Sequence, residues 1–216
     1  LSVIIHHRRK DRPDYITFSE AGMIGKIGMN QAGLGVGLNI LFYPHELSGL
    51  PTHITCRDVL DATSLGAARK RLLDSDMGKA SHIVIGDNHG SCTSFEFMGQ
   101  TRHEVATGQE VFLHTNHCIA DDTSNSVTDL ATSRERFSCA TELIRSDEKH
   151  DLATAKKILL SRAPGSFAIN RPYVESEVWE GYKVGTCATI LMELKMGIFH
   201  VKRGPGLLSE FVSYRL

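Results

Sequence analysis

The sequence lacks any apolar run near the ~18–20 residues that a membrane-spanning helix needs. Residues 1–12 also lack the order of a signal peptide, in which positive charges precede an apolar core. We therefore expect no membrane partner. The last three residues, 214–216, are similar to a peroxisomal targeting tripeptide, but tyrosine is a poor first residue for that signal. A cytoplasmic location is the expectation, and a peroxisomal one is the alternative.

Motifs that hold cofactors or metals are also missing. The five cysteines are scattered without a CxxC pair, so we expect reduced thiols rather than a disulfide framework. One cluster, His114, His117 and Cys118, has no matching second pair, and a metal site is not expected. The glycine-rich residues 22–37 are followed by no helical pattern, which argues against a dinucleotide loop, and no GxSxG motif occurs. The expected cofactor set is therefore empty.

Net charge is almost absent, at -1 from 24 basic and 25 acidic residues. That balance creates no field that would gather nucleic acid. The basic run His6–Arg12 lacks the interleaved aromatic residues of a nucleic-acid surface. We interpret this run as a solvated hairpin tip and expect no nucleic-acid partner.

What is present is the composition of one globular domain over residues 1–216, with 41% hydrophobic and 23% charged residues. Alternating runs predict strands at 3–6, 15–18, 24–29, 34–41, 82–85, 93–97, 103–106, 111–115, 186–194, 197–202 and 211–214. A helical period predicts two helices within 55–74, with Thr52 and Thr55 as candidate caps, then helices at 129–145 and 152–160. This order predicts an α+β domain in which sheets are stacked between helix layers.

Glycine is dense in the first strand region, at Gly22, Gly25, Gly28, Gly33, Gly35 and Gly37. Inside strands such residues usually mark bulges or places where another segment approaches the backbone closely. We expect something to pass close to that sheet.

Three polar residues interrupt apolar strands near a turn, where a site can open without disturbing the core: Asn39, Asn116 and Arg171. An asparagine amide at a strand end can donate to a developing oxyanion, but it can equally stabilise an unusual turn. Arg171 can bind a carboxylate or steer a catalytic group, and a surface ion pair is the alternative. Spacing alone leaves both interpretations open.

The segment Glu20 to Asn39, which reads EAGMIGKIGMNQAGLGVGLN, resembles the corresponding stretch of the isopenicillin N acyltransferase family of N-terminal-nucleophile hydrolases. The resemblance continues at residues 50–54, at Phe95-Glu96-Phe97, at residues 114–118 and around Phe167 and Arg171, and it covers nearly the whole chain. It implies a four-layer αββα fold with antiparallel sheets between helix layers. It also implies a precursor that cleaves itself to expose a cysteine, which attacks an amide or thioester and forms an acyl-enzyme.

By position, Asn116 is similar to the family's oxyanion-hole asparagine, Asn39 to a second site asparagine, and Arg171 to the arginine near the nucleophile. The family's cysteine, and the aspartate soon after it, are expected upstream of Leu1, so that upstream segment is the expected partner and residues 1–216 alone are expected to be inactive. The acyltransferase serine three residues before the arginine is Ala168 here, with Ser166 nearby, which puts penicillin-type specificity in doubt. The expected substrate is a small amide or acyl-CoA. A plain amide hydrolase and a catalytically silent binding homologue are the alternatives.

One internal cysteine offers a competing nucleophile, because cleavage before Cys92 in the segment Gly90-Ser91-Cys92-Thr93 would expose it at a new N-terminus. Cys92 also opens an alternating strand in mid-chain, and the structural interpretation is favoured for that reason.

Overall fold

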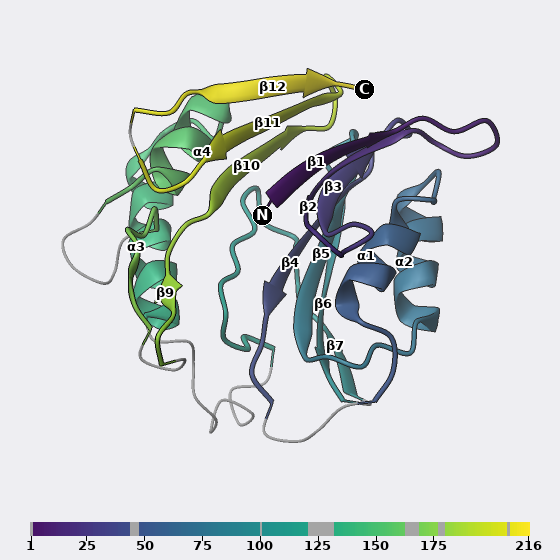
Figure 1. Cartoon of the computed structure of the whole chain (residues 1–216), viewed down its shortest axis with the longest axis horizontal. Coiled ribbons are helices and arrows are strands. Elements are labelled where there is room, and N and C mark those ends of the chain that lie inside the picture. The colour runs from purple at the N-terminus through teal and green to yellow at the C-terminus, as the bar shows by residue number, and fades with distance from the viewer. Residues whose placement is uncertain are drawn as a thin grey trace.

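The computed structural model describes residues 2–43, 48–99, 101–120, 132–162, 169–176, 180–206 and 208–216. Its largest element is a sheet of seven antiparallel strands that lie in chain order, as Figure 1 shows. They are β1 (Ser2–His7), β2 (Tyr15–Glu20), β3 (Ile27–Asn30), β4 (Gly35–Ile40), β5 (Ser81–Gly86), β6 (Cys92–Met98) and β7 (Thr101–Glu104). Each of these strands therefore hydrogen-bonds to the next one along the chain. This includes β4 and β5, although two helices are inserted between them.

Those helices, α1 (Thr52–Val59) and α2 (Leu65–Asp74), cover one face of the seven-stranded sheet. Because side chains alternate along a strand, Val36 and Leu38 of β4 and Ile83 and Ile85 of β5 point to the same face and pack with the helices in the main core. Asn39 and His82 consequently point to the opposite face.

The helix caps differ from those expected. Residue 64 caps α2, where the Ser64 hydroxyl accepts a hydrogen bond from the backbone N–H of Ala67 at 3.2 Å. Helix α1 begins after Pro51 without a side-chain cap. The Thr52 hydroxyl instead bonds Ser81 Oγ at 3.0 Å, and the buried Thr55 hydroxyl has no hydrogen-bond partner in the described structure. The two threonine caps were therefore wrongly predicted.

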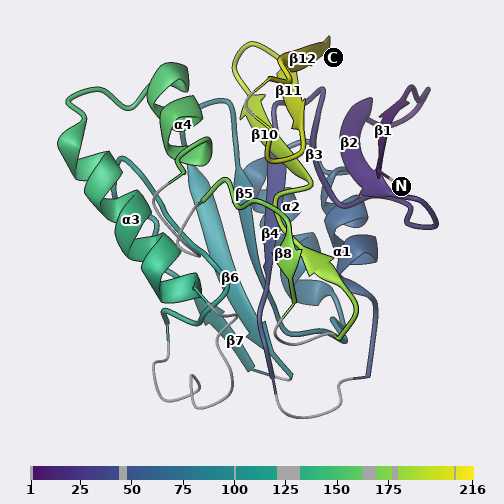
Figure 2. The same ribbon diagram turned by 60° about the vertical axis from the view of Figure 1, so that its left-hand side comes forward.

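A second sheet packs on the open face of the first. It contains β10 (Ala188–Glu193), β11 (Ile198–Arg203) and β12 (Phe211–Arg215), and a small hairpin of β8 (Val174–Glu175) and β9 (Lys183–Val184) precedes it. Buried Phe199 of this sheet meets Ile16 and Met29 of the first. Beyond it lie α3 (Ser133–Ser146) and α4 (Leu152–Leu159), and α4 contacts β10 (Figure 2). The order helix, sheet, sheet, helix is the four-layer arrangement that was expected.

At Gly35 the segment after β10 approaches the backbone of the first sheet closely. A Cβ placed on Gly35 would lie 2.7 Å from Cδ2 of Leu194, which directly follows β10. A real Cβ cannot occupy that position without displacing the leucine. The expectation that a segment passes close to the glycine-rich strands is confirmed at this residue.

Other boundaries also differ from those predicted. Residues 111–115 form no strand, and the side chains of His114 and Thr115 bond to Glu96 and to the backbone carbonyl of Ser133. The strand expected at 103–106 is β7, which begins and ends two residues earlier. The helix expected from residue 129 is described from Ser133, and residues 121–131 lie outside the described structure.

The basic hairpin tip is not simply solvated. It joins β1 to β2, and Arg9 and Arg12 both form ion pairs with Asp61, which follows α1 and whose side chain is only 5% exposed. The carboxylate also binds Arg57 at 2.7 Å. These contacts tie the hairpin tip to the end of α1. No helix among the described residues has the length and apolar character required to cross a membrane.

Candidate functional site

Both predicted asparagines are found at the carboxyl end of β4, one within the strand and the other bonded to its backbone. Asn116 lies in the segment that crosses the sheet face, and its Nδ2 donates to the backbone carbonyl of Ile40 at 3.1 Å. Ile40 directly follows Asn39 in the sequence. The structure therefore places the Asn116 amide against the backbone next to Asn39, which lies 77 positions earlier in the chain.

Buried His82 fixes the orientation of the Asn39 amide. Its Nδ1 lies 2.9 Å from Oδ1 of Asn39, and its Nε2 lies 2.7 Å from the Ser94 hydroxyl. An amide oxygen only accepts hydrogen bonds, so Nδ1 carries the proton and Nε2 accepts from Ser94. Burial, with a further contribution from the charge of His114, lowers the pKa of His82 to about 2, which keeps the ring neutral. Asn39 Nδ2 makes no hydrogen bond to any described residue and can donate to a ligand.

Asn116 is oriented in a similar way by an arginine that the sequence reasoning missed. Arg136 of α3 donates to Oδ1 of Asn116 at 2.9 Å, and the backbone N–H of Asn116 donates to Ser133 Oγ at 2.8 Å. With its oxygen occupied and one Nδ2 hydrogen on Ile40, the amide keeps one N–H for a ligand among the described contacts. Nothing in the spacing of α3 distinguishes Arg136 from an ordinary surface arginine.

Glu96 and His114, which the sequence did not predict as catalytic residues, form a second polar group next to His82. The His82 and His114 rings stack with centroids 3.5 Å apart, and His114 Nε2 lies 2.8 Å from Oε1 of Glu96. Glu96 is fully buried and also accepts the backbone N–H groups of Ile119 and Ala120. Burial by itself raises the pKa of Glu96, but these hydrogen bonds outweigh it and hold the pKa below its usual value. A charged residue between Phe95 and Phe97 was the available signal.

Arg171 belongs to the same region. Its backbone N–H donates to Thr186 Oγ1 at 2.9 Å, and its buried Nε has no hydrogen-bond partner in the described structure. Burial, and after it the positive charge of Arg171, lowers the pKa of Arg136, so the two guanidinium groups influence each other. The surface ion pair considered for Arg171 is not present among the described residues. Residues 163–168, which include Ser166, Phe167 and Ala168, lie outside the described structure.

The cluster that suggested a metal has other partners. His117 Nδ1 lies 2.9 Å from Ser133 Oγ and 3.1 Å from the Thr115 hydroxyl, and Cys118 Sγ lies 3.2 Å from Met98 Sδ. No group of three or more potential ligands is assembled for a metal ion within the part of the chain that the structure describes.

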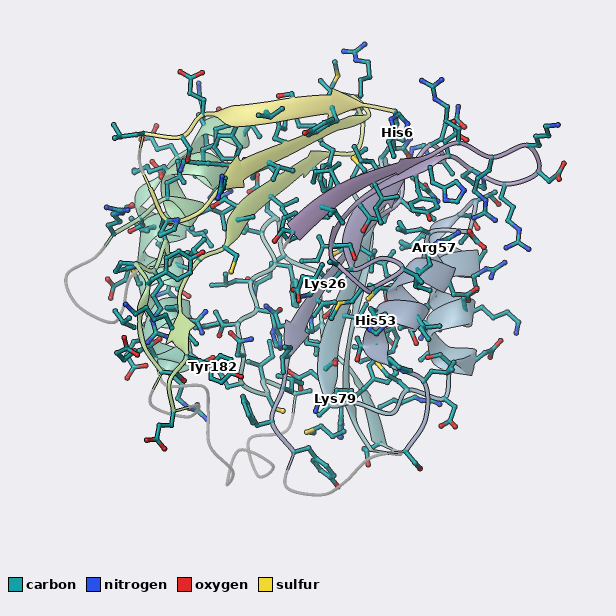
Figure 3. All side chains as sticks on the ribbon, viewed as in Figure 1. His6, Lys26, His53, Arg57, Lys79 and Tyr182 are labelled. Atoms are coloured by element: carbon teal, nitrogen blue, oxygen red, sulfur yellow. The ribbon has the colours of Figure 1, made fainter. Side chains whose placement is uncertain are left out.

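An apolar cavity of about 370 Å³ lies next to this region. The side chains of Leu38 and Ile40 form one wall, on the sheet face opposite Asn39, and three basic residues line it as well: Lys26, His53 and Lys79, which Figure 3 shows near β4 and α1. The cavity and the asparagines thus share Ile40, since its side chain lines the cavity and its carbonyl binds Asn116.

Comparison with known proteins places the chain in one family. Residues 2–199 match the sequence model described as acyl-coenzyme A:6-aminopenicillanic acid acyl-transferase. A relative from Emericella nidulans, the 40 kDa form of acyl-coenzyme A:6-aminopenicillanic-acid-acyltransferase, is 34% identical over 111 residues. That stretch is 50% of this chain and only 30% of the relative.

Solved structures support the fold. A conjugated bile acid hydrolase from Clostridium perfringens superposes with a TM-score of 0.64 and 15% identity, over 94% of this chain and 77% of that one. Penicillin V acylase from Agrobacterium tumefaciens gives 0.61 and 14%, over 94% and 70%. The family match covers most of the chain, so the protein belongs to the acyl-coenzyme A:6-aminopenicillanic acid acyltransferase family and has the αββα fold of N-terminal-nucleophile hydrolases.

Proposed function

We propose that these residues form the oxyanion-binding part of an acyl-transfer site, in which a cysteine upstream of Leu1 is the nucleophile. The observation that carries the proposal is the pair of asparagine amides at the end of β4. Each has its oxygen occupied, by His82 or by Arg136, and each keeps an N–H to donate. Fixed hydrogen-bond donors of this kind are what a developing oxyanion needs.

The proposed reaction has two steps. The cysteine thiolate attacks the carbonyl carbon, a C–S bond forms, and the π electrons move to the oxygen, where Asn39 and Asn116 donate hydrogen bonds. The tetrahedral intermediate collapses, the C–N bond breaks, and the amine leaves with a proton from the cysteine's own α-amino group. Water or a second amine then attacks the thioester and releases the thiol. Arg171 orients groups around the nucleophile.

Three internal cysteines are poorly placed for this role, which supports an upstream nucleophile. Burial raises the pKa of Cys56 to about 12, which disfavours the thiolate. Cys118 is 4% exposed and contacts Met98. Cys92 begins β6, whose opposite end holds Glu96 and Met98, so it lies away from the asparagines along the strand.

The cavity at Ile40 favours an acyl donor with an anionic group, such as an acyl-CoA. Its size falls in the range of ~300–1,000 Å³ that holds small ligands, and its apolar wall suits an acyl chain. Lys79 is exposed and makes no ion pair within the described structure, so it can meet a phosphate. Lys79→Glu should raise KM for an acyl-CoA but not for an uncharged acyl amide. Lys70→Glu on the outer side of α2 is the matched control.

The test of the function uses the protein with its upstream sequence, incubated with fatty-acyl, phenylacetyl and aminoacyl amides and with acyl-CoA. We expect acyl release, and mass spectrometry should locate a thioester on a cysteine upstream of Leu1. Inhibition of hydrolysis by acyl-CoA would identify a transferase, while its absence would identify a plain amide hydrolase. An acyl adduct on Cys92, turnover by residues 1–216 alone, or no turnover of any substrate would refute the proposed site.

A further inference from the structure

The hydrogen bonds around His114 define its protonation state. Nδ1 lies 2.6 Å from the carbonyl oxygen of Thr115, and Nε2 lies 2.8 Å from Oε1 of Glu96. A carbonyl oxygen cannot donate, so Nδ1 must carry a hydrogen. The proton between Nε2 and Glu96 then belongs either to the imidazole or to the carboxyl group.

The surroundings of Glu96 assign that proton to the histidine. Oε1 also accepts the N–H of Ile119 at 2.7 Å, and Oε2 accepts the N–H of Ala120 at 3.1 Å. Two backbone N–H donors stabilise the ionised carboxylate of Glu96. The same donors disfavour its neutral, protonated form. Both side chains are sealed from water, with 0% of Glu96 and 2% of His114 exposed. An ionised Glu96 in such a place requires a cation, and His114 is the side chain in contact with it.

We propose that His114 is an imidazolium ion at neutral pH, and that the Glu96–His114 pair is the positioning element that sets both asparagine amides. On one side, the charge on His114 adds to burial in keeping the stacked ring of His82 neutral, with its Nδ1 hydrogen on Asn39. On the other side, Glu96 holds His114 and residues 119–120, and Asn116 lies between these anchor points. Among the described residues, the charged groups that face this assembly are Glu96 from β6 and Arg136 from α3, the latter through Asn116, and Arg171 acts on Arg136 in turn.

The positioning role rests on the proposed function, whereas the protonation state does not. If Glu96 becomes an amide, His114 loses the carboxylate that holds its charge, and the stacked ring of His82 loses a charged neighbour that helps to fix its position against Asn39. Glu96→Gln should therefore lower kcat by ~10- to 100-fold through misplaced donors. KM should change little, because oxyanion donors act mainly in the transition state. Glu96→Asp should restore part of the loss.

The experiment combines ring ¹⁵N NMR of histidine-labelled protein with kinetics. In the unmodified protein at neutral pH, we expect both His114 nitrogens to show protonated-type shifts and His82 to show one protonated and one bare nitrogen. Glu96→Gln should convert His114 to a neutral ring, and Glu104→Gln on exposed β7 should not.

A bare nitrogen on His114 in the unmodified protein would overturn the proposal, and this measurement needs no variant that must fold. Normal kcat in a folded Glu96→Gln protein would overturn the positioning role. An imidazolium in a protein without acyl-transfer activity would instead refute only the proposed function.

Discussion

The imidazole of His82 lies face to face with that of His114, with the ring centroids 3.5 Å apart and the planes 5° from parallel. Two imidazolium ions at that separation would repel each other strongly in a site closed to water. Since His114 faces a carboxylate and His82 faces a neutral amide and a hydroxyl, the charge belongs on His114. His82 must then remain neutral in the folded protein.

The first prediction concerns stability against pH. Folding lowers the pKa of His82 from 6.5 to about 2, so below pH 6.5 the unfolded chain binds a proton that the folded chain does not. Stability from this residue is complete above pH 6.5 and is lost as the pH falls. Between pH 7 and 5 the loss should be about 2 kcal/mol. Urea denaturation at both pH values should show a smaller loss in His82→Gln, whereas exposed His89→Gln should behave as the unmodified protein.

The second prediction concerns Asn116. Asn116→Ala should lower kcat by ~100-fold or more in the complete enzyme, because an oxyanion donor acts on charge present mainly in the transition state. Circular dichroism should show an intact fold, and Gln31→Ala, which removes an exposed amide, should have no effect. Activity within a few-fold of normal in a folded Asn116→Ala protein would mean that this amide is not an oxyanion donor.

The third prediction concerns Arg171. Its Nε is buried without a partner in the described structure, and lysine has no nitrogen at that position. Arg171→Lys should therefore lower kcat/KM by ~10-fold or more, although the charge is retained. Arg215→Lys, at the end of β12, serves as the comparison. Equal kinetics in the two variants would mean that Arg171 contributes nothing to the site.

The fourth prediction tests the contact between the sheets. Gly35→Ala places a Cβ about where Leu194 now lies and should cost ~1–3 kcal/mol of unfolding free energy. Combined with Leu194→Ala, the substitution should cost much less than the sum of the single changes. Gly66→Ala in α2, where a Cβ meets nothing within 4 Å, should be neutral or stabilising. Additive costs for Gly35 and Leu194 would contradict the close approach.

Sequence patterns predicted the layers better than the contacts within the site. Strands such as β2 and β5 were found because their apolar side chains are buried in the cores on either side of the sheet. The run at 111–115 was predicted as a strand in the same way, yet these residues pair with no strand. The side chains of His114 and Thr115 instead form hydrogen bonds with Glu96 and Ser133. Periodicity indicates which residues are buried. It does not indicate whether their hydrogen bonds are made by the backbone or by the side chains.

The same limit explains which site residues were missed. Asn39, Asn116 and Arg171 were selected because they interrupt apolar segments or match a family motif. Arg136 and His82 acquire their roles only through partners 20 and 43 positions away, Asn116 and Asn39 respectively, and no local pattern encodes such a pairing.

The chain order of the seven strands has a consequence for how the protein folds. Neighbouring strands are also neighbours in sequence, so most of the sheet can form by closing short loops. Asn39 and His82 belong to that sheet. Asn116 and Arg136 reach them only when α3 and the segment that contains Asn116 pack against the sheet. A refolding chain should therefore complete the sheet first and gain its second amide donor last, so recovery of activity should lag behind recovery of β structure.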